Sequence, residues 1–185
     1  MSRLRIFAEV GGASLKTVSK HAEIARELGH VGVRFELWEA SKPVVPGASQ
    51  DEVIAAYRTD IERLQRENGY QAVDVISLTP EHPDRATLRA KFLNEHSHSE
   101  DEVRFFVAGR GLFTLHIGEK VYEVLCEQGD LIGVPDNTRH WFDMSESPCF
   151  IAIRLFTNKD GWVANFTGSD IAEHFPRLPA ESIAA

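Results

Sequence analysis

Four side chains that could bind a metal ion lie in two clusters in the second half of the chain. His96, His98 and Glu102 form the pattern H-x-H-x-x-x-E, and a glycine follows after six further residues. The second cluster reads G-x5-P-x-N-x-x-H and ends at His140. Imidazole nitrogens and a carboxylate oxygen are hard-to-borderline ligands, which suit iron, nickel or manganese better than calcium or a metal that prefers thiolates.

This ligand set favours a catalytic metal over a structural one. Around a divalent ion, three neutral imidazoles and one carboxylate leave a net charge of about +1. An octahedral ion would keep two positions open, for water or for a bidentate anionic ligand. Structural zinc sites, by contrast, are closed and usually rich in cysteine.

Strand geometry explains how the ligands could converge. Side chains two residues apart on a strand share a face, so the two histidines of the first cluster project together. By the same alternation Glu102 shares a face with Arg104, and His140 shares a face with Phe142. We therefore expect a barrel with the ligands at its centre and Arg104 and Phe142 beside the metal. Arg104 would add positive charge and a planar fork for an enolate or carboxylate, whereas its alternative is a surface charge at a strand edge.

The chain after residue 101 has the pattern of a mainly β fold. Turn signals recur at short intervals, and Gly118-Glu119 suits a two-residue type II′ hairpin turn. Many short strands with regular turns favour a sandwich or barrel. The expected strands cover residues 102–107, 111–117, 121–126, 131–134, 140–143 and 150–156.

The first ninety residues mix helix and strand. The clearest helix covers 50–68, where Ser49 and Glu52 form a capping box and Gly69 stands where a C-terminal cap belongs. The other expected elements are strands over 4–8, 31–38 and 73–78, helices over 17–28 and 84–92, and a helical turn over 170–175.

Length and composition predict one ordinary globular domain. Its 185 residues would divide into an α/β decoration at about 1–90, a metal-binding core at about 91–157 and a C-terminal cap at 158–185. The net charge of −8 argues against binding to nucleic acid, which needs clustered lysine and arginine. The N-terminus lacks the apolar core of a signal peptide, and no apolar run is long enough to span a membrane. We therefore expect a cytoplasmic protein with no membrane partner.

The remaining histidines and the cysteines have no evident chemical role. His21, His30, His82, His116 and His174 lack a ligand-like partner in the sequence and are expected to be structural. Cys126 and Cys149 lie in apolar neighbourhoods and are expected to be small buried residues. Arg154 lies within the apolar run 150–156, which leaves both a buried ion pair and a substrate contact open.

The two clusters resemble the paired motifs of the cupin superfamily, G-x5-H-x-H-x3-4-E-x6-G and G-x5-P-x-G-x2-H-x3-N. Here Ala90 replaces the first glycine, Asn137 replaces the glycine after P-x, and Met144 replaces the final asparagine. These departures leave the ligands intact, but they do not fit a germin or a sugar-isomerase cupin.

Longer strings resemble one branch, the acireductone dioxygenases, over nearly the whole chain. They are KFLNEHSHSEDEVRFFV from Lys91, GDLIGVP from Gly129, TRHWFDM from Thr138 and IRLFTN from Ile153. Shorter ones are GWVA from Gly161, GVRFELW from Gly32, AYR from Ala56 and YQAVDV from Tyr70.

The resemblance implies a monomeric, mainly β cupin barrel with helices packed outside it. It implies one Fe²⁺ or Ni²⁺ per monomer, held by His96, His98, Glu102 and His140. The substrates would be dioxygen and the acireductone of methionine salvage, 1,2-dihydroxy-3-keto-5-methylthiopentene. Iron would give formate and 2-keto-4-methylthiobutyrate, and nickel would give methylthiopropionate, formate and carbon monoxide. The implied substrate contacts are Phe92, Arg104, Phe142, Arg154 and Trp162, with Arg104 as the residue that stabilises the anion.

Two other readings stay open at this point. The chain could be another metal-dependent cupin enzyme, such as a flavonol or thiol dioxygenase or an isomerase. It could also be a non-catalytic cupin that binds a small metabolite. Cupins that only bind often lose metal ligands, and the intact set here speaks against that second reading.

Overall fold

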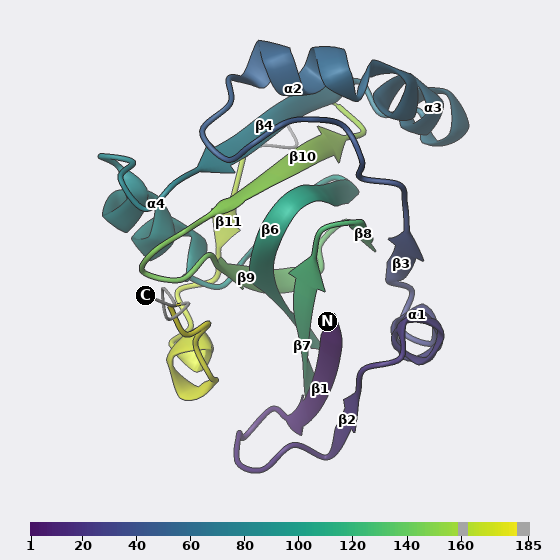
Figure 1. Ribbon diagram of the computed structural model, residues 1–185. Coiled ribbons are helices and arrows are strands. Elements are labelled where there is room, and N and C mark those ends of the chain that lie inside the picture. The colour runs from purple at the N-terminus through teal and green to yellow at the C-terminus, as the bar shows by residue number, and fades with distance from the viewer. Residues whose placement is uncertain (159–162, 181–185) are drawn as a thin grey trace.

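The computed structural model describes residues 1–158 and 163–180, and one long strand organises it (Figure 1). β6 (Glu102–Ile117) pairs through its first half with β8 (Asp130–Val134) and β10 (Phe150–Phe156). Its second half pairs with β7 (Lys120–Glu127) and β9 (Arg139–Asp143). The sequence predicted two strands here. The structure has a single bent strand instead. At the bend, between Phe106 and Ala108, the pairing of β6 with β10 shifts its register between Ile151 and Ala152.

Strands from the first ninety residues extend the same sheet. β1 (Arg3–Ala8) pairs with β7, β3 (Arg34–Leu37) with β8, and β4 (Ala72–Leu78) with β10. Three short strands complete the set that the described residues form: β2 (Lys16–Val18), β5 (His96–Ser97) and β11 (Asn165–Phe166).

The sheet curls around the site without closing into a ring. Within the described residues, β2 and β11 end one path of the strand order, and β3 and β4 each have a single strand neighbour. The mainly β cupin class with helices outside is confirmed, although the expected barrel is an open one.

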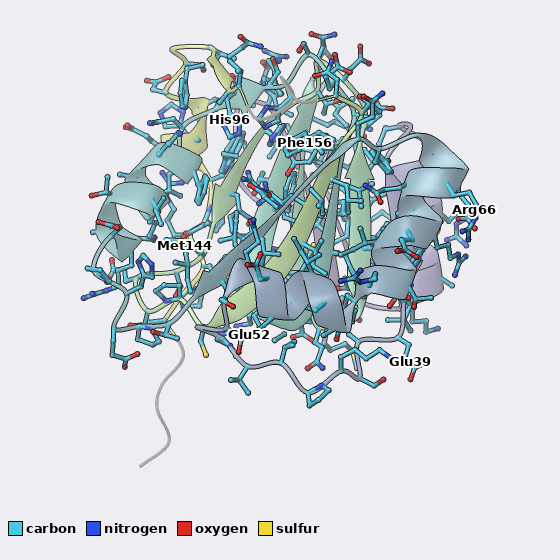
Figure 2. The ribbon with its side chains drawn as sticks, turned by 90° about the horizontal axis from the view of Figure 1, so that it is seen from above. Glu39, Glu52, Arg66, His96, Met144 and Phe156 are labelled. Atoms are coloured by element: carbon cyan, nitrogen blue, oxygen red, sulfur yellow. The ribbon has the colours of Figure 1, made fainter. Side chains whose placement is uncertain are left out.

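Helices cover the outer faces of the sheet. α2 (Gln50–Ala56) packs on β4, and α3 (Arg58–Asn68) follows it beyond the end of β10 (Figure 1). Glu52 and Arg66 mark these two helices in the view from above (Figure 2). They bury the outward side of β6 and β10 in an apolar layer that contains Leu64, Phe105 and Ile153. α1 (His21–Gly29) packs beside β3, and α4 (Arg85–Phe92) contacts β9. None of the helices in the described part of the chain is long and apolar enough to cross a membrane.

Two of the predicted helices needed correction. The helix expected over 17–28 begins at His21, because residues 16–18 pair with β1 as strand β2. The helix expected over 50–68 breaks at Tyr57, whose φ of −104° and ψ of 19° are not helical. Tyr57 is fully buried there, and its ring packs edge-on against Phe105 at 5.6 Å. Tertiary packing thus overrides the helical pattern, while the Ser49–Glu52 capping box and the left-handed Gly69 are confirmed.

Several smaller expectations can also be judged. The other strand predictions and the helix before Phe92 agree with the structure to within a few residues, and the helical turn at 170–175 is a 3₁₀ turn, Ile171–His174. The Gly118-Glu119 hairpin is confirmed, with Gly118 at φ +61°. Cys126 is buried, but the prediction for Cys149 is wrong, because its loop before β10 exposes the side chain.

Gly109 makes the bend in β6 possible. Gly109 has φ +66°, and an added Cβ would lie 1.9 Å from the carbonyl oxygen of Cys149. Gly118 has a similar φ of +61° with nothing within 4 Å. We expect Gly118→Ala to cost only the left-handed strain of about 1–2 kcal/mol. Gly109→Ala should cost clearly more in urea unfolding, and equal costs for the two variants would contradict this account of the bend.

Candidate metal centre

The four predicted ligands meet at one end of the curled sheet. His96 on β5 is the backbone partner of His140 on β9, and their ring centroids lie 4.4 Å apart. Ligand atoms of His96, His98 and His140 all lie within 4.8 Å of one another. Glu102 begins β6, and its Oε2 lies 3.4 Å from His98 Nε2 and 3.7 Å from His140 Nε2. All four side chains are buried. In Figure 2, His96 is labelled at the same end of the strands as Phe156, away from Glu39.

Backbone carbonyls orient all three imidazoles. Nδ1 of His96 donates to the carbonyl of Asn94 at 2.7 Å, and Nδ1 of His140 donates to that of Thr138 at 2.8 Å. Nδ1 of His98 donates to the carbonyl of Val163 at 2.9 Å. Because a carbonyl can only accept, Nδ1 carries the proton of each neutral ring, and Nε2 keeps its lone pair for a metal.

The polar atoms at the centre fit a bound cation. Among the described residues, Glu102 Oε2 and His140 Nε2 are buried and have no hydrogen-bond partner. A buried acceptor without a donor costs free energy, and a divalent ion between these acceptors would remove that cost. The donor set of three imidazole nitrogens and a carboxylate oxygen suits such an ion.

Burial and neighbouring charges keep these groups in the forms that bind metal. Burial is the main cause that lowers the pKa of His140 to about 3, and it also lowers the pKa of His96. For Glu102, burial alone would raise the pKa, but the charges of Arg104 and the nearby histidines hold it well below its usual range. At neutral pH the rings of His96 and His140 are therefore neutral and the carboxylate of Glu102 is ionised.

A pH dependence follows for the protein without metal. The pKa of His140 falls from 6.5 to about 3 on folding, so the unfolded chain binds more protons between these values. His140 thus contributes stability that is complete above pH 6.5 and is lost as the pH falls towards 3, by up to about 1.4 kcal/mol per unit. The low pKa of Glu102 acts in the same direction below 4.5.

We expect urea unfolding of the metal-free protein to show this loss between about pH 7 and about pH 5. His140→Gln should flatten the slope across the same range. An equal slope in the variant would show that other groups cause the loss.

Arg104 lies directly behind Glu102, as the alternation of side chains predicted. Only 2% of it is exposed, so the alternative of a surface charge is wrong. Its Nε and Nη2 both donate to Glu102 Oε1, at 3.1 and 2.6 Å, which leaves Oε2 for an ion. Its guanidinium lies 4.7 Å from the ring centroids of Phe113 and Phe142. Nη1 is buried and has no hydrogen-bond partner among the described residues, so one donor remains for a ligand.

A cavity of about 270 Å³ opens beside these residues. Of the residues expected to contact a substrate, Phe92, Arg104, Phe142 and Arg154 line it, together with His96 and His98. Trp162 lies outside the described residues. Arg154 is also ion-paired with Asp74, since its Nε and Nη2 donate to the carboxylate at 2.9 and 2.5 Å. Both of the roles left open for Arg154 therefore fit its position.

Sequence reasoning missed five residues of this lining: Asp74, Leu88, Lys91, Ala164 and Phe166. Leu88 and Lys91 precede Phe92 by four residues and one residue on α4, and the helical spacing of Leu88 with Phe92 could have indicated it. Ala164 and Phe166 come from the C-terminal segment, for which the sequence gives no comparable signal.

Comparisons with known proteins agree with this site. Residues 3–164 match the model of the ARD/ARD' family. The acireductone dioxygenase of Pseudomonas savastanoi pv. phaseolicola is 63% identical over 96% of this chain and 99% of its own length. That of Stenotrophomonas maltophilia (strain K279a) is 61% identical over 96% of each chain.

A solved structure extends the likeness to three dimensions. It is described as acireductone dioxygenase from Bacillus anthracis with cadmium ion in active center, and it is 33% identical with a TM-score of 0.77. The match covers 90% of this chain and 98% of that one. Family model, relatives and structure all match nearly the full length, and the chain therefore belongs to the ARD/ARD' family.

Proposed function

We propose that the protein is a metal-dependent dioxygenase that cleaves 1,2-dihydroxy-3-keto-5-methylthiopentene with dioxygen in methionine salvage. The observation that carries this proposal is the buried group of three histidines and Glu102 that adjoins a small cavity containing Arg104. The full-length similarity to acireductone dioxygenases supports it.

In this proposal His96, His98, Glu102 and His140 hold one Fe²⁺ or Ni²⁺. When bound, the ion supplies a Lewis acid that orients the enediolate of the substrate for reaction with dioxygen. Backbone carbonyls accept hydrogen bonds from Nδ1 of the three histidines and fix their rings. Arg104 fixes the carboxylate of Glu102 by donating to its Oε1. The chain thus presents a rigid set of acceptors and leaves the rest of the ion's surroundings to the ligand.

We also propose roles for the other residues that line the cavity. Arg104 Nη1, which has no partner in the described structure, would donate to an oxygen of the anionic substrate. Phe92 and Phe142 would form an apolar wall for the methylthio tail. Their rings pack edge-on, with centroids 6.3 Å apart. Arg154 would add positive charge on the same side, held in place by Asp74. Trp162 remains a predicted contact.

The cavity of about 270 Å³ lies at the small end of ligand pockets, a size that accommodates a short linear metabolite such as this substrate. Among the described residues, the unpartnered acceptors of Glu102 and His140 also speak against a cupin that has lost its metal.

Reloading the protein with one metal at a time tests the proposal. Protein stripped of metal and loaded with Fe²⁺ should convert the acireductone and dioxygen to 2-keto-4-methylthiobutyrate and formate. Loaded with Ni²⁺, it should give methylthiopropionate, formate and carbon monoxide. Turnover of a flavonol or a thiol, with the acireductone untouched by either form, would favour another cupin dioxygenase.

We also propose that the protein works as a monomer in the cytoplasm, as the resemblance implies. Light scattering after gel filtration should then give a mass near 20.7 kDa. A mass of twice that value would overturn the monomer.

A further inference from the structure

A second buried carboxylate, Glu95, lies next to the metal site and is not part of it. Only 1% of Glu95 is exposed. Its Oε1 accepts a hydrogen bond from His116 Nδ1 at 2.6 Å, and its Oε2 accepts one from Thr167 Oγ1 at 2.7 Å. Neither Glu95 nor Thr167 stood out in the sequence, and His116 was expected to have no partner of this kind.

These bonds join three separate parts of the chain. Glu95 precedes β5, His116 lies near the end of β6, and Thr167 follows β11. The amide of Thr167 also donates to the carbonyl of Glu95, at 3.1 Å. Glu95 therefore binds the C-terminal segment through both its backbone and its side chain, and at the same time it is tied to the central strand.

The C-terminal segment from Val163 to Thr167 in turn touches two of the proposed ligands. The carbonyl of Val163 accepts a hydrogen bond from His98 Nδ1 at 2.9 Å. Phe166 is the backbone partner of His96, and the two rings lie 5.7 Å apart. A displacement of this segment would thus remove the hydrogen bond that orients the ring of His98 and one of the two strands that flank His96.

Stability alone is a poor reason for this buried carboxylate. A carboxylate loses its hydration on burial, and hydrogen bonds to a histidine and a threonine do little more than offset that cost. Residues that orient the ligands of a metal, on the other hand, typically matter by about 10–100-fold in metal affinity.

We propose that Glu95 is a positioning residue of the metal site, which fixes His96 and His98 by holding β5 and the segment 163–167 together through His116 and Thr167. This inference rests on the proposed metal ligands, but not on the substrate or the reaction. Its test therefore measures metal binding and needs no turnover.

The experiment compares Glu95→Gln with Glu123→Gln as a matched control. Glu123 is also 1% exposed, and it accepts from Arg5 Nε at 2.6 Å and Arg5 Nη2 at 2.8 Å, on β7. Both variants remove the charge of a buried, paired carboxylate, so both should unfold at lower urea concentration. Competition with a chelator should show Ni²⁺ affinity about 10–100-fold weaker in Glu95→Gln and unchanged in Glu123→Gln. The visible absorption of the Co²⁺-loaded protein should change only in Glu95→Gln.

Thr167 provides a second, milder pair of variants. Its side chain is exposed, and its hydroxyl donates to Glu95 and accepts a hydrogen bond from the backbone N–H of Ser169 at 3.2 Å, so Thr167→Val should fold. We expect Thr167→Val to weaken Ni²⁺ binding and Thr167→Ser, which keeps the hydroxyl, to retain it. Wild-type affinity in Thr167→Val would overturn the proposal even if Glu95→Gln fails to fold. Equal losses of affinity in Glu95→Gln and Glu123→Gln would also overturn it. A wild-type protein that binds no Ni²⁺ would instead refute the proposed metal site.

Discussion

Glu102→Gln should weaken Ni²⁺ binding by at least about 100-fold and abolish turnover at ordinary metal concentrations. Two effects combine in this variant. The ion loses its anionic ligand, Oε2, and Arg104 loses the partner that neutralises it in a site where only 2% of the arginine is exposed. An uncompensated buried charge of this kind costs about 3–5 kcal/mol, so the metal-free variant should also be less stable in urea.

The matched control for this variant is again Glu123→Gln. Glu123 and Glu102 are equally buried carboxylates that pair with an arginine on a strand. The control should lose stability and keep its Ni²⁺ affinity, since Glu123 lies on β7 and contacts no proposed ligand in the described structure. If Glu102→Gln bound Ni²⁺ as tightly as the wild type, the assigned ligand set would be wrong.

Arg104→Met should lower kcat/KM for the acireductone by about 10²–10³ while metal stays bound at saturating Ni²⁺ or Fe²⁺. Methionine can fill the space between Phe113 and Phe142, where the guanidinium lies 4.7 Å from each ring. It cannot donate a hydrogen bond or supply positive charge to a bound anion. The loss should therefore appear in steady-state kinetics, with metal occupancy measured on the same samples by elemental analysis.

Arg5→Met serves as the control, because Arg5 also pairs with a buried carboxylate and lies outside the cavity. It should leave kcat/KM unchanged. Full turnover in metal-loaded Arg104→Met would remove the electrostatic role of Arg104 and leave the fold and the metal site untouched.

Much of this site could be predicted because strand geometry is local. The alternation of side chains put Arg104 on the same face as Glu102, and Phe142 on the same face as His140. In the structure the guanidinium of Arg104 contacts both Glu102 and the ring of Phe142. The departure of Asn137 from the cupin motif also has a local explanation. Asn137 has φ +56°, a left-handed conformation in which asparagine is the usual substitute for glycine. Its backbone N–H donates to the carbonyl of His98 at 2.7 Å.

The parts that could not be predicted depend on contacts between distant segments. Tyr57 breaks a well-marked helix because its ring is buried against Phe105, about fifty residues away in the sequence. The bond from Glu95 to Thr167 spans 72 residues, and Phe166 reaches the cavity only because β11 pairs with β5. No periodicity within a short window encodes such pairings, so the helix break and the C-terminal wall of the cavity needed the structure.

The most direct test of the central claim is the rate at which the acireductone disappears in the presence of this protein. The substrate is mixed with metal-loaded protein without oxygen, oxygenated buffer is added, and the ultraviolet band of the enediolate is followed. We expect the band to disappear much faster than in buffer or with metal-free protein, with dioxygen consumed in equal amount. A band that decays no faster with Fe²⁺- or Ni²⁺-loaded protein than in buffer would contradict the proposed function.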